Sequence, residues 1–303
     1  MSSMNRRLTF STLAISTIAA LALSGCSTSS EPAEDKDISI VASTAIWGDV
    51  AQNIADTADS PVTVTSIIEG NAIDPHHFEP SATDIAKAKE ADIVVVGGGG
   101  YDAWLYEAVD NTTVIHAMEL TSHEHDHDHD HHHGHDGETA ENEHIWYDTE
   151  AVADVASEIA EGINNINIDA HADAAGYVEK LEAIHKRILD LPEATVAQTE
   201  PIADYLLAHS QMTDITPEGY HAATIAEQEP TAADLAAFLD LINSGKLQAL
   251  IYNPQTETDM TKRIHQAAKD KKIPVVEIYE TPPAGESYLD LVTNAVDQLE
   301  AIQ

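Results

Sequence analysis

The densest chemistry in this 303-residue sequence is a run of histidines and acidic residues near its middle. Eight of the 17 histidines lie between residues 123 and 135, most of them alternating with aspartates. Neutral imidazole is a common ligand of transition metals, and alternate side chains of an extended chain share one face. The pattern predicts weak, multi-site capture of zinc, copper or nickel; the alternative is a solvated acidic loop whose histidines are incidental. The predicted accessory ligands are His123, His125, His127, His129, His131, His132, His133 and His135.

Four other residues are candidates for a tight metal site, because each lies on a loop that leads from a strand or an insertion into a helix. A tight site needs a few ligands held by rigid elements. Taken singly, each has a plainer interpretation, since a histidine can cap a helix and a glutamate can simply be solvated; His77 is an alternative to its neighbour His76. Two candidates come from each half of the chain, as a site bridging a cleft would need: His76, His144, Glu200 and Glu280.

The start of the chain has the pattern of an export signal. Two arginines, Arg6 and Arg7, precede an uncharged apolar stretch of the length found in signal peptides. Small residues then lead to Cys26, which resembles a bacterial lipobox and predicts lipidation there, with residues 1–25 removed and residues 26–37 as a flexible tether. The protein would then lie on the outer face of the cytoplasmic membrane; the alternative is a stray thiol after an uncleaved signal.

Composition excludes several classes of function. Cys26 is the only cysteine, which rules out an internal disulfide, an Fe–S cluster and a thiolate-rich metal site. Fifty-three acidic residues against 14 lysines and arginines give a net charge of −39. Nucleic-acid binding is therefore disfavoured, because the phosphate backbone needs cations opposite it. An acidic surface concentrates cations instead.

The candidate ligands must be positioned by alternating strands and helices, which indicate an α/β fold with mostly parallel sheets. The predicted strands are 38–42, 62–68, 93–96, 113–117, 195–198, 249–251 and 274–278. The predicted helices are 47–57, 81–90, 101–109, 149–162, 169–189, 202–209, 232–244, 258–271 and 288–301. We expect two lobes, each a parallel sheet flanked by helices, on either side of a long helical connector. The expected divisions are a first lobe at 38–148 with the histidine-rich loop at 121–143, a helical connector at 149–190 and a second lobe at 191–303.

These motifs together resemble the metal-binding periplasmic substrate-binding proteins of ABC importers, the zinc and manganese class. Residues Asp74–His76 are similar to the Asp-Pro-His segment of that family, and residues Gly99–Trp104 match its Gly-x-x-x-x-Trp turn. His144, in His-Ile-Trp, matches the second ligand of the family. Glu200 lies five residues before a tyrosine, as the third ligand does, and Glu280 corresponds to the acid after the last strand.

The resemblance implies a fold in which one long rigid helix, here at about 169–189, joins the two lobes. It also implies that the protein captures an ion in the cleft between its lobes and delivers it to a permease. It implies Zn²⁺ as the cargo, because the histidine-rich insertion is typical of zinc members, with Mn²⁺ as the second choice, because glutamate at position 200 also occurs in manganese members. No phosphate-binding loop is present, so the permease and the ATPase must be separate chains. We expect a monomer, a membrane contact through the lipid anchor, and no enzymatic activity.

Two other functions remain open at this point. A metallohydrolase could use the same ligands to activate a water, although four protein ligands would close a tetrahedral zinc site and no His-Glu-x-x-His helix occurs. A storage or chaperone protein would use the histidine-rich loop as its working part and the lobes as a scaffold.

Overall fold

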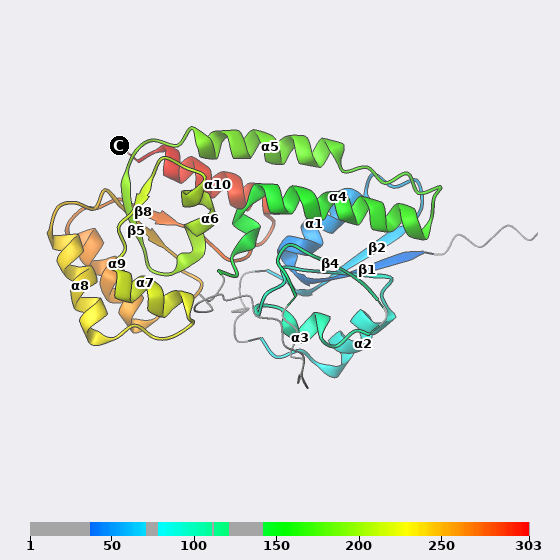
Figure 1. The fold of residues 1–303 in the computed structure, drawn as a ribbon, viewed down its shortest axis with the longest axis horizontal. Helices are drawn as coiled ribbons and strands as arrows, with labels where there is room; N and C mark the ends of the chain where they lie inside the picture. The colour runs from blue at the N-terminus through cyan, green and yellow to red at the C-terminus, as the bar shows by residue number, and fades with distance from the viewer. Residues whose placement is uncertain (1–36, 71–77, 111, 121–141, 303) are drawn as a thin grey trace, which may run out of the picture. The chain divides into compact units, whose positions relative to one another are not determined.

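Two four-stranded parallel sheets organise the chain, as the alternating pattern predicts (Figure 1). The computed structural model describes residues 37–70, 78–110, 112–120 and 142–302. The first sheet has the order β2 (Val62–Ile68), β1 (Ile38–Thr44), β3 (Ile93–Val96) and β4 (Thr113–His116). The second has the order β6 (Thr213–Asp214), β5 (Thr195–Gln198), β7 (Ala249–Tyr252) and β8 (Val275–Glu277). The α/β class is confirmed.

Helices connect the parallel strands and cover both faces of each sheet (Figure 1). In the first half these are α1 (Ala45–Ala55), α2 (Ala82–Glu90) and the short α3 (Ala103–Tyr106). Two longer helices follow, α4 (Thr149–Ile166) and α5 (Ala175–Leu189). The second half contains α6 (Asp204–Ala208), α7 (Glu218–Ile225), α8 (Ala232–Asn243), α9 (Asp259–Asp270) and α10 (Tyr288–Glu300).

Strands of both sheets divide their side chains between two cores. Along β1, Ile40 joins a large core shared by both halves, whereas its neighbour Val41 packs on the opposite face with α2 and α3. Likewise Ile251 of β7 lies in the shared core, and Leu250 packs with α8 and α9. Because consecutive side chains of a strand point to opposite faces, strands covered on both sides read as uninterrupted apolar runs.

The shared core connects the two halves through α1, α4, α5 and α10. Trp47 of α1, Leu181 of α5 and Val292 of α10 are fully buried in it. Burying an aliphatic side chain such as Leu181 or Val292 contributes about 1.5–3 kcal/mol to stability. A continuous core of this kind resists large relative movement of the two sheets.

The helix that we expected at 169–189 begins at Ala175 instead. Ala170 and Ala174 fit the helical spacing and are buried, but they lie in an irregular segment. The side-chain amide of Asn164 holds this segment, since it donates to the carbonyl of Ala172 and accepts from its N–H, both at 2.8 Å. The three- and four-residue spacing of the apolar residues therefore predicted a helix that begins too far toward the N-terminus.

Two elements were not predicted from the sequence. Strand β6 has only two residues, which is too short for an alternating pattern. Helix α7 buries only Tyr220 among its eight residues, so it has no apolar face of the kind that identifies a helix.

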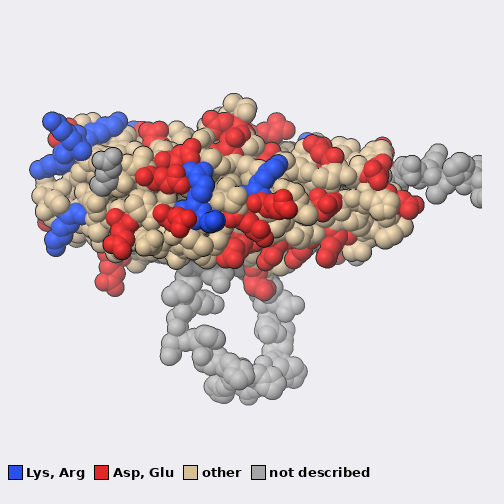
Figure 2. All heavy atoms as spheres, turned by 90° about the horizontal axis from the view of Figure 1, so that it is seen from above, with Lys and Arg blue, Asp and Glu red and all other residues tan. Residues whose placement is uncertain are grey.

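Carboxylates dominate the surface shown in Figure 2, where lysines and arginines gather mainly toward the second half of the chain. Six of the 14 basic residues lie between positions 246 and 272. Among the described residues, no helix has the length and apolar character needed to cross a bilayer. The predicted export signal, the tether up to residue 36 and Cys26 lie outside the described residues.

Candidate metal centre

Three of the four predicted ligands meet in one cluster. His144, Glu200 and Glu280 each offer a ligand atom, and these atoms all lie within 4.8 Å of one another. His144 is 5 % exposed and Glu280 is fully buried, whereas Glu200 is half-buried. The fourth predicted ligand, His76, lies outside the described residues, and so do the eight accessory histidines of the loop.

Parallel strands of the second sheet bring the two carboxylates together. Glu200 follows β5 and Glu280 follows β8, and both strands pair with β7 between them. The residue directly after β7 is Asn253, which donates from Nδ2 to an oxygen of Glu200 and, at 3.1 Å, to Oε1 of Glu280. The carboxyl ends of adjacent parallel strands thus present three polar side chains at one edge, where ligands bind in folds of this class.

His144 is oriented by a side-chain amide. Its backbone N–H donates to Oδ1 of Asn142 at 3.0 Å, and its ring Nδ1 lies 2.7 Å from the same oxygen. Because an amide oxygen only accepts, Nδ1 carries a proton, and in the neutral ring Nε2 therefore carries the lone pair. Nε2 lies 3.9 Å from Oε1 of Glu280. Two electron-pair donors that face each other in this way form an arrangement that a cation stabilises.

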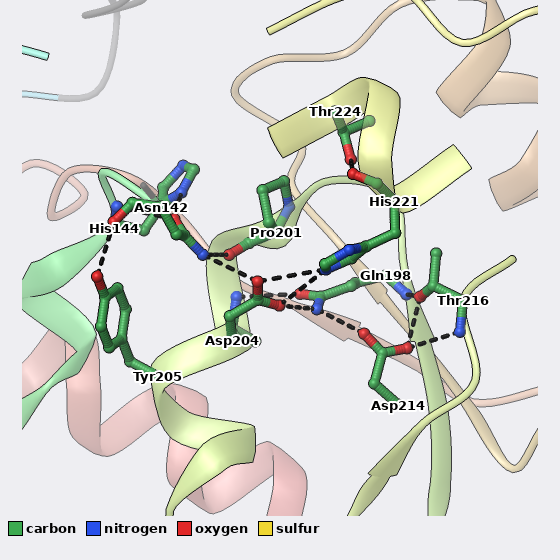
Figure 3. Close-up of polar contacts among 11 residues, drawn as sticks. Asn142, His144, Gln198, Pro201, Asp204, Tyr205, Asp214, Thr216, His221 and Thr224 are labelled. Carbon is green, nitrogen blue, oxygen red and sulfur yellow. Dashed lines mark hydrogen bonds and ion pairs between the residues drawn. The ribbon is translucent and has the colours of Figure 1, made fainter. Parts of the chain in front are cut away.

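The same amide connects His144 to the loop that carries Glu200 (Figure 3). Nδ2 of Asn142 donates to the carbonyl of Pro201 at 2.6 Å and to Asp204 at 3.1 Å, and the hydroxyl of Tyr205 donates to the carbonyl of Asn142 at 2.8 Å. Two acceptors on the Nδ2 side establish which end of the amide faces His144. One asparagine therefore sets the positions of two candidate ligands relative to each other.

Burial and repulsion make the Glu200 carboxylate costly without a cation. Burial, and then the charge of Glu280, raise the pKa of Glu200 to about 7, even though Thr256 donates to it at 2.5 Å. Nearby His144 and the amide of Asn253 act in the opposite direction. A bound divalent cation would remove both penalties, because it replaces water as the partner of the charge.

A residue of the first half also reaches the site. The hydroxyl of Tyr101 donates to Oε2 of Glu280 at 3.1 Å. Tyr101 follows a glycine loop that is organised by the buried carboxylate of Asp102, which accepts from Ser43 at 2.6 Å and from the backbone N–H groups of Gly97 and Gly98. Burial, opposed by these bonds, raises the pKa of Asp102 to about 6. The glycine pattern in the sequence identified this turn, but it did not predict the contact between Tyr101 and Glu280.

An acidic hollow of about 540 Å³ borders the cluster. His144 and Glu200 line it together with the carboxylates of Glu143, Glu227 and Glu257. Negative walls raise the local concentration of cations, which suits an approach route for a positively charged ligand.

The fold and the cluster define a class of protein: two α/β lobes with a site for a metal cation built from imidazole and carboxylate groups. The chain belongs to the family described as zinc-uptake complex component A, periplasmic, whose model matches residues 40–302. It is a metal-binding substrate-binding protein of an ABC importer and not an enzyme, which removes the metallohydrolase alternative.

Curated relatives match over nearly the whole chain. The manganese-binding lipoprotein MntA of Halalkalibacterium halodurans is 24 % identical, over 92 % of this chain and 94 % of that protein. The manganese ABC transporter substrate-binding lipoprotein ScaA of Streptococcus gordonii is 23 % identical, over 93 % of this chain and 94 % of that protein. Both relatives are lipoproteins by name.

Solved structures share the fold. A crystal structure of ZnuA has a TM-score of 0.63 at 20 % identity and covers 87 % of this chain and 97 % of its own. The periplasmic zinc-binding protein TroA of Treponema pallidum has a TM-score of 0.65 at 15 % identity and covers 88 % of this chain and 99 % of its own. Zinc and manganese proteins thus both occur among the similar proteins.

Proposed function

We propose that this protein captures Zn²⁺ between its two lobes and delivers the ion to an ABC permease driven by a separate ATPase. The observation that carries the proposal is the facing pair of His144 Nε2 and Glu280 Oε1, with Glu200 beside them. Imidazole and carboxylate oxygen are both good zinc ligands, and zinc sites are usually four-coordinate.

We propose His76 as the fourth ligand. Support comes from the described residues on either side of the segment that contains it. The carbonyl of Gly70 accepts a hydrogen bond from Thr281, the neighbour of Glu280, at 3.2 Å. The ring of Phe78 lies 5.0 Å from the ring of Trp104, in the helix that follows Tyr101.

Manganese is the second candidate for the cargo. Carboxylate ligands suit Mn²⁺, and the two curated relatives described above are named for manganese. Zinc is favoured by the imidazole ligands, by the histidine-rich loop at 121–143 and by the zinc-uptake family to which the chain belongs. In this proposal the loop gathers ions and the cleft binds one tightly.

We further propose that the mature protein is a monomer held by lipid on Cys26 at the outer face of the cytoplasmic membrane. The lipoprotein names of the relatives support this placement. The divisions at 38–148, 149–190 and 191–303 belong to the same proposal, with residues 26–37 as the tether.

The test is metal binding by the metal-free mature chain, with zinc and manganese in competition. One tight zinc site is expected, and it should disappear when His76, His144, Glu200 and Glu280 are all changed to alanine. A control with Glu182→Ala and Glu193→Ala, two exposed glutamates, should keep it. Deletion of residues 121–141 should remove only weak sites. Wild-type affinity in the four-alanine variant would refute the cleft site. Loss of the tight site on loop deletion would favour the storage function. Preferential binding of manganese would make manganese, and not zinc, the proposed cargo.

A further inference from the structure

A second group of metal-binding side chains lies where three helices meet, outside the cluster of His144, Glu200 and Glu280. Ligand atoms of His185, His209 and Glu150 all lie within 4.8 Å of one another. His185 belongs to the last turns of α5, His209 ends α6, and Glu150 lies in the first turn of α4. Asp148, at the start of α4, adds a second carboxylate. No side chain is common to the two groups.

The atoms that face each other here are those that bind metals. Nε2 of His185 lies 4.0 Å from Oε2 of Glu150, and Nε2 of His209 lies 3.8 Å from Oδ2 of Asp148. The two imidazole rings lie 5.1 Å apart, edge to face. In tetrahedral zinc sites, bonds of 2.0–2.2 Å put neighbouring ligand atoms about 3.4 Å apart. Small side-chain rotations would close the group around an ion.

Existing hydrogen bonds already orient two of these side chains. Nδ1 of His185 lies 3.1 Å from the hydroxyl of Thr149, so the ring presents its other nitrogen to Glu150. Asp148 uses Oδ1 to accept from the N–H groups of Glu150 and Ala151 at the start of α4, and its Oδ2 faces His209. Partners of this kind commonly orient the ligands of metal sites.

A third group of acidic and histidine side chains shows what distinguishes this one. Asp204, Asp214 and His221 also lie close together (Figure 3). There the amide of Gln198 donates to both aspartates, and Thr216 donates twice to Asp214, at 2.7 and 2.6 Å. Those carboxylates are engaged in a hydrogen-bonded network of the second lobe, and the group has only one imidazole.

We propose that His185, His209, Glu150 and Asp148 form a second binding site for zinc. Two imidazoles with two carboxylates make a ligand set suited to Zn²⁺, whereas manganese prefers oxygen ligands. The side chains of His185 and His209 are 19 % and 33 % exposed, and that of Glu150 is 67 % exposed, so an ion can enter from solvent. The bound ion would link α4 and α5 to α6, which follows directly on the loop of Glu200. It would stabilise the junction between the connecting helices and the second lobe.

Zinc stoichiometry of the full mature chain tests this site. The variant His185→Gln/His209→Gln should bind one ion fewer than wild type, because the loop histidines are the same in both proteins and their contribution cancels. The control His171→Asn/His265→Gln should bind as wild type does; asparagine suits position 171, where φ is +49°. Crystals soaked in zinc chloride should show an anomalous peak between His185 and His209, and crystals soaked in manganese chloride should not.

The cleft and this site can be separated. The ion at His185 and His209 should persist in a His144→Ala/Glu280→Gln variant, and zinc should still raise the melting temperature of that variant. Equal stoichiometry in wild type and His185→Gln/His209→Gln, together with no anomalous peak at these residues, would overturn the inference and leave the cleft site unaffected. Melting temperatures measured without metal show whether each variant is folded.

Discussion

The metal-free protein should lose stability as the pH rises from about 5 to 8, and Glu200 should account for a measurable part of the loss. Burial and the charge of Glu280 raise the pKa of Glu200 from its ordinary 4.5 to about 7. The folded metal-free protein therefore binds this proton more tightly than the unfolded chain does. Its contribution to stability is fully present below about pH 4.5 and is lost by about pH 7.

The magnitude follows from the difference between the two pKa values, which corresponds to about 3 kcal/mol. Bound metal should reverse the direction in which Glu200 makes stability depend on pH, because the cation stabilises the charged carboxylate and must displace the proton. Zinc affinity should fall about tenfold for each pH unit below 7 for each proton displaced. The metal-free and metal-bound proteins should thus differ most in stability above neutral pH.

Urea unfolding of the metal-free protein at several pH values checks this reasoning. Glu200→Gln keeps the size of the side chain, but glutamine cannot ionise. The free energy of unfolding of this variant should therefore fall less between pH 5 and 8 than that of wild type. Glu193→Gln, the same change at an exposed position, should behave as wild type. If wild type and Glu200→Gln lose stability in parallel, then burial of Glu200 and its proximity to Glu280 do not shift its titration as argued.

Two further substitutions probe the residues that hold the ligands. Asn142→Ala removes the oxygen that orients His144 and the donor to the carbonyl of Pro201. Zinc affinity, measured by competition with a chelating dye, should therefore fall about 10- to 100-fold. An unchanged affinity would show that other contacts hold the ring of His144. Tyr101→Phe removes the hydroxyl that donates to Glu280 and should weaken zinc binding about tenfold, whereas Tyr279→Phe, whose hydroxyl faces Glu277, should bind as wild type does.

The elements were predictable wherever local chemistry determines them. The strand Ile93–Val96 is four consecutive apolar residues with a face in each of two cores, and no other element suits that pattern in so short a run. Helix α2 begins where Ser81 and Asp84 form a reciprocal cap, which the spacing of serine and acid predicts. The position of a strand end then predicted Glu200 and Glu280, because loops after parallel strands carry the site.

The residues that support the ligands were not predictable in the same way. Asn253 contacts both carboxylates only because β7 lies between β5 and β8, and strand order is not visible in a single sequence. Tyr101 meets Glu280 across 179 positions of chain. Asn142 did precede His144 by two residues, a spacing at which an amide can contact both the N–H and the ring, so local reasoning could have identified it.

The supporting contacts also indicate how the site would open. His144 precedes the connecting helices, yet Asn142 connects it to the loop of Glu200. Trp146 and Tyr147, which follow His144 closely, are held from the same side. The hydroxyl of Tyr147 donates to the carbonyl of Tyr279 at 2.7 Å, and that of Tyr288 donates to the carbonyl of Trp146 at 2.6 Å. Three of the candidate ligands therefore belong mechanically to the second lobe. Among the described residues, the first lobe reaches this side of the site through the hydroxyl of Tyr101, which donates to Glu280, and through the carbonyl of Gly70, which accepts from Thr281. A small rotation of the first sheet would break these hydrogen bonds without requiring His144, Glu200 or Glu280 to move. We therefore expect release of the ion to depend on the first lobe moving away from an intact set of three.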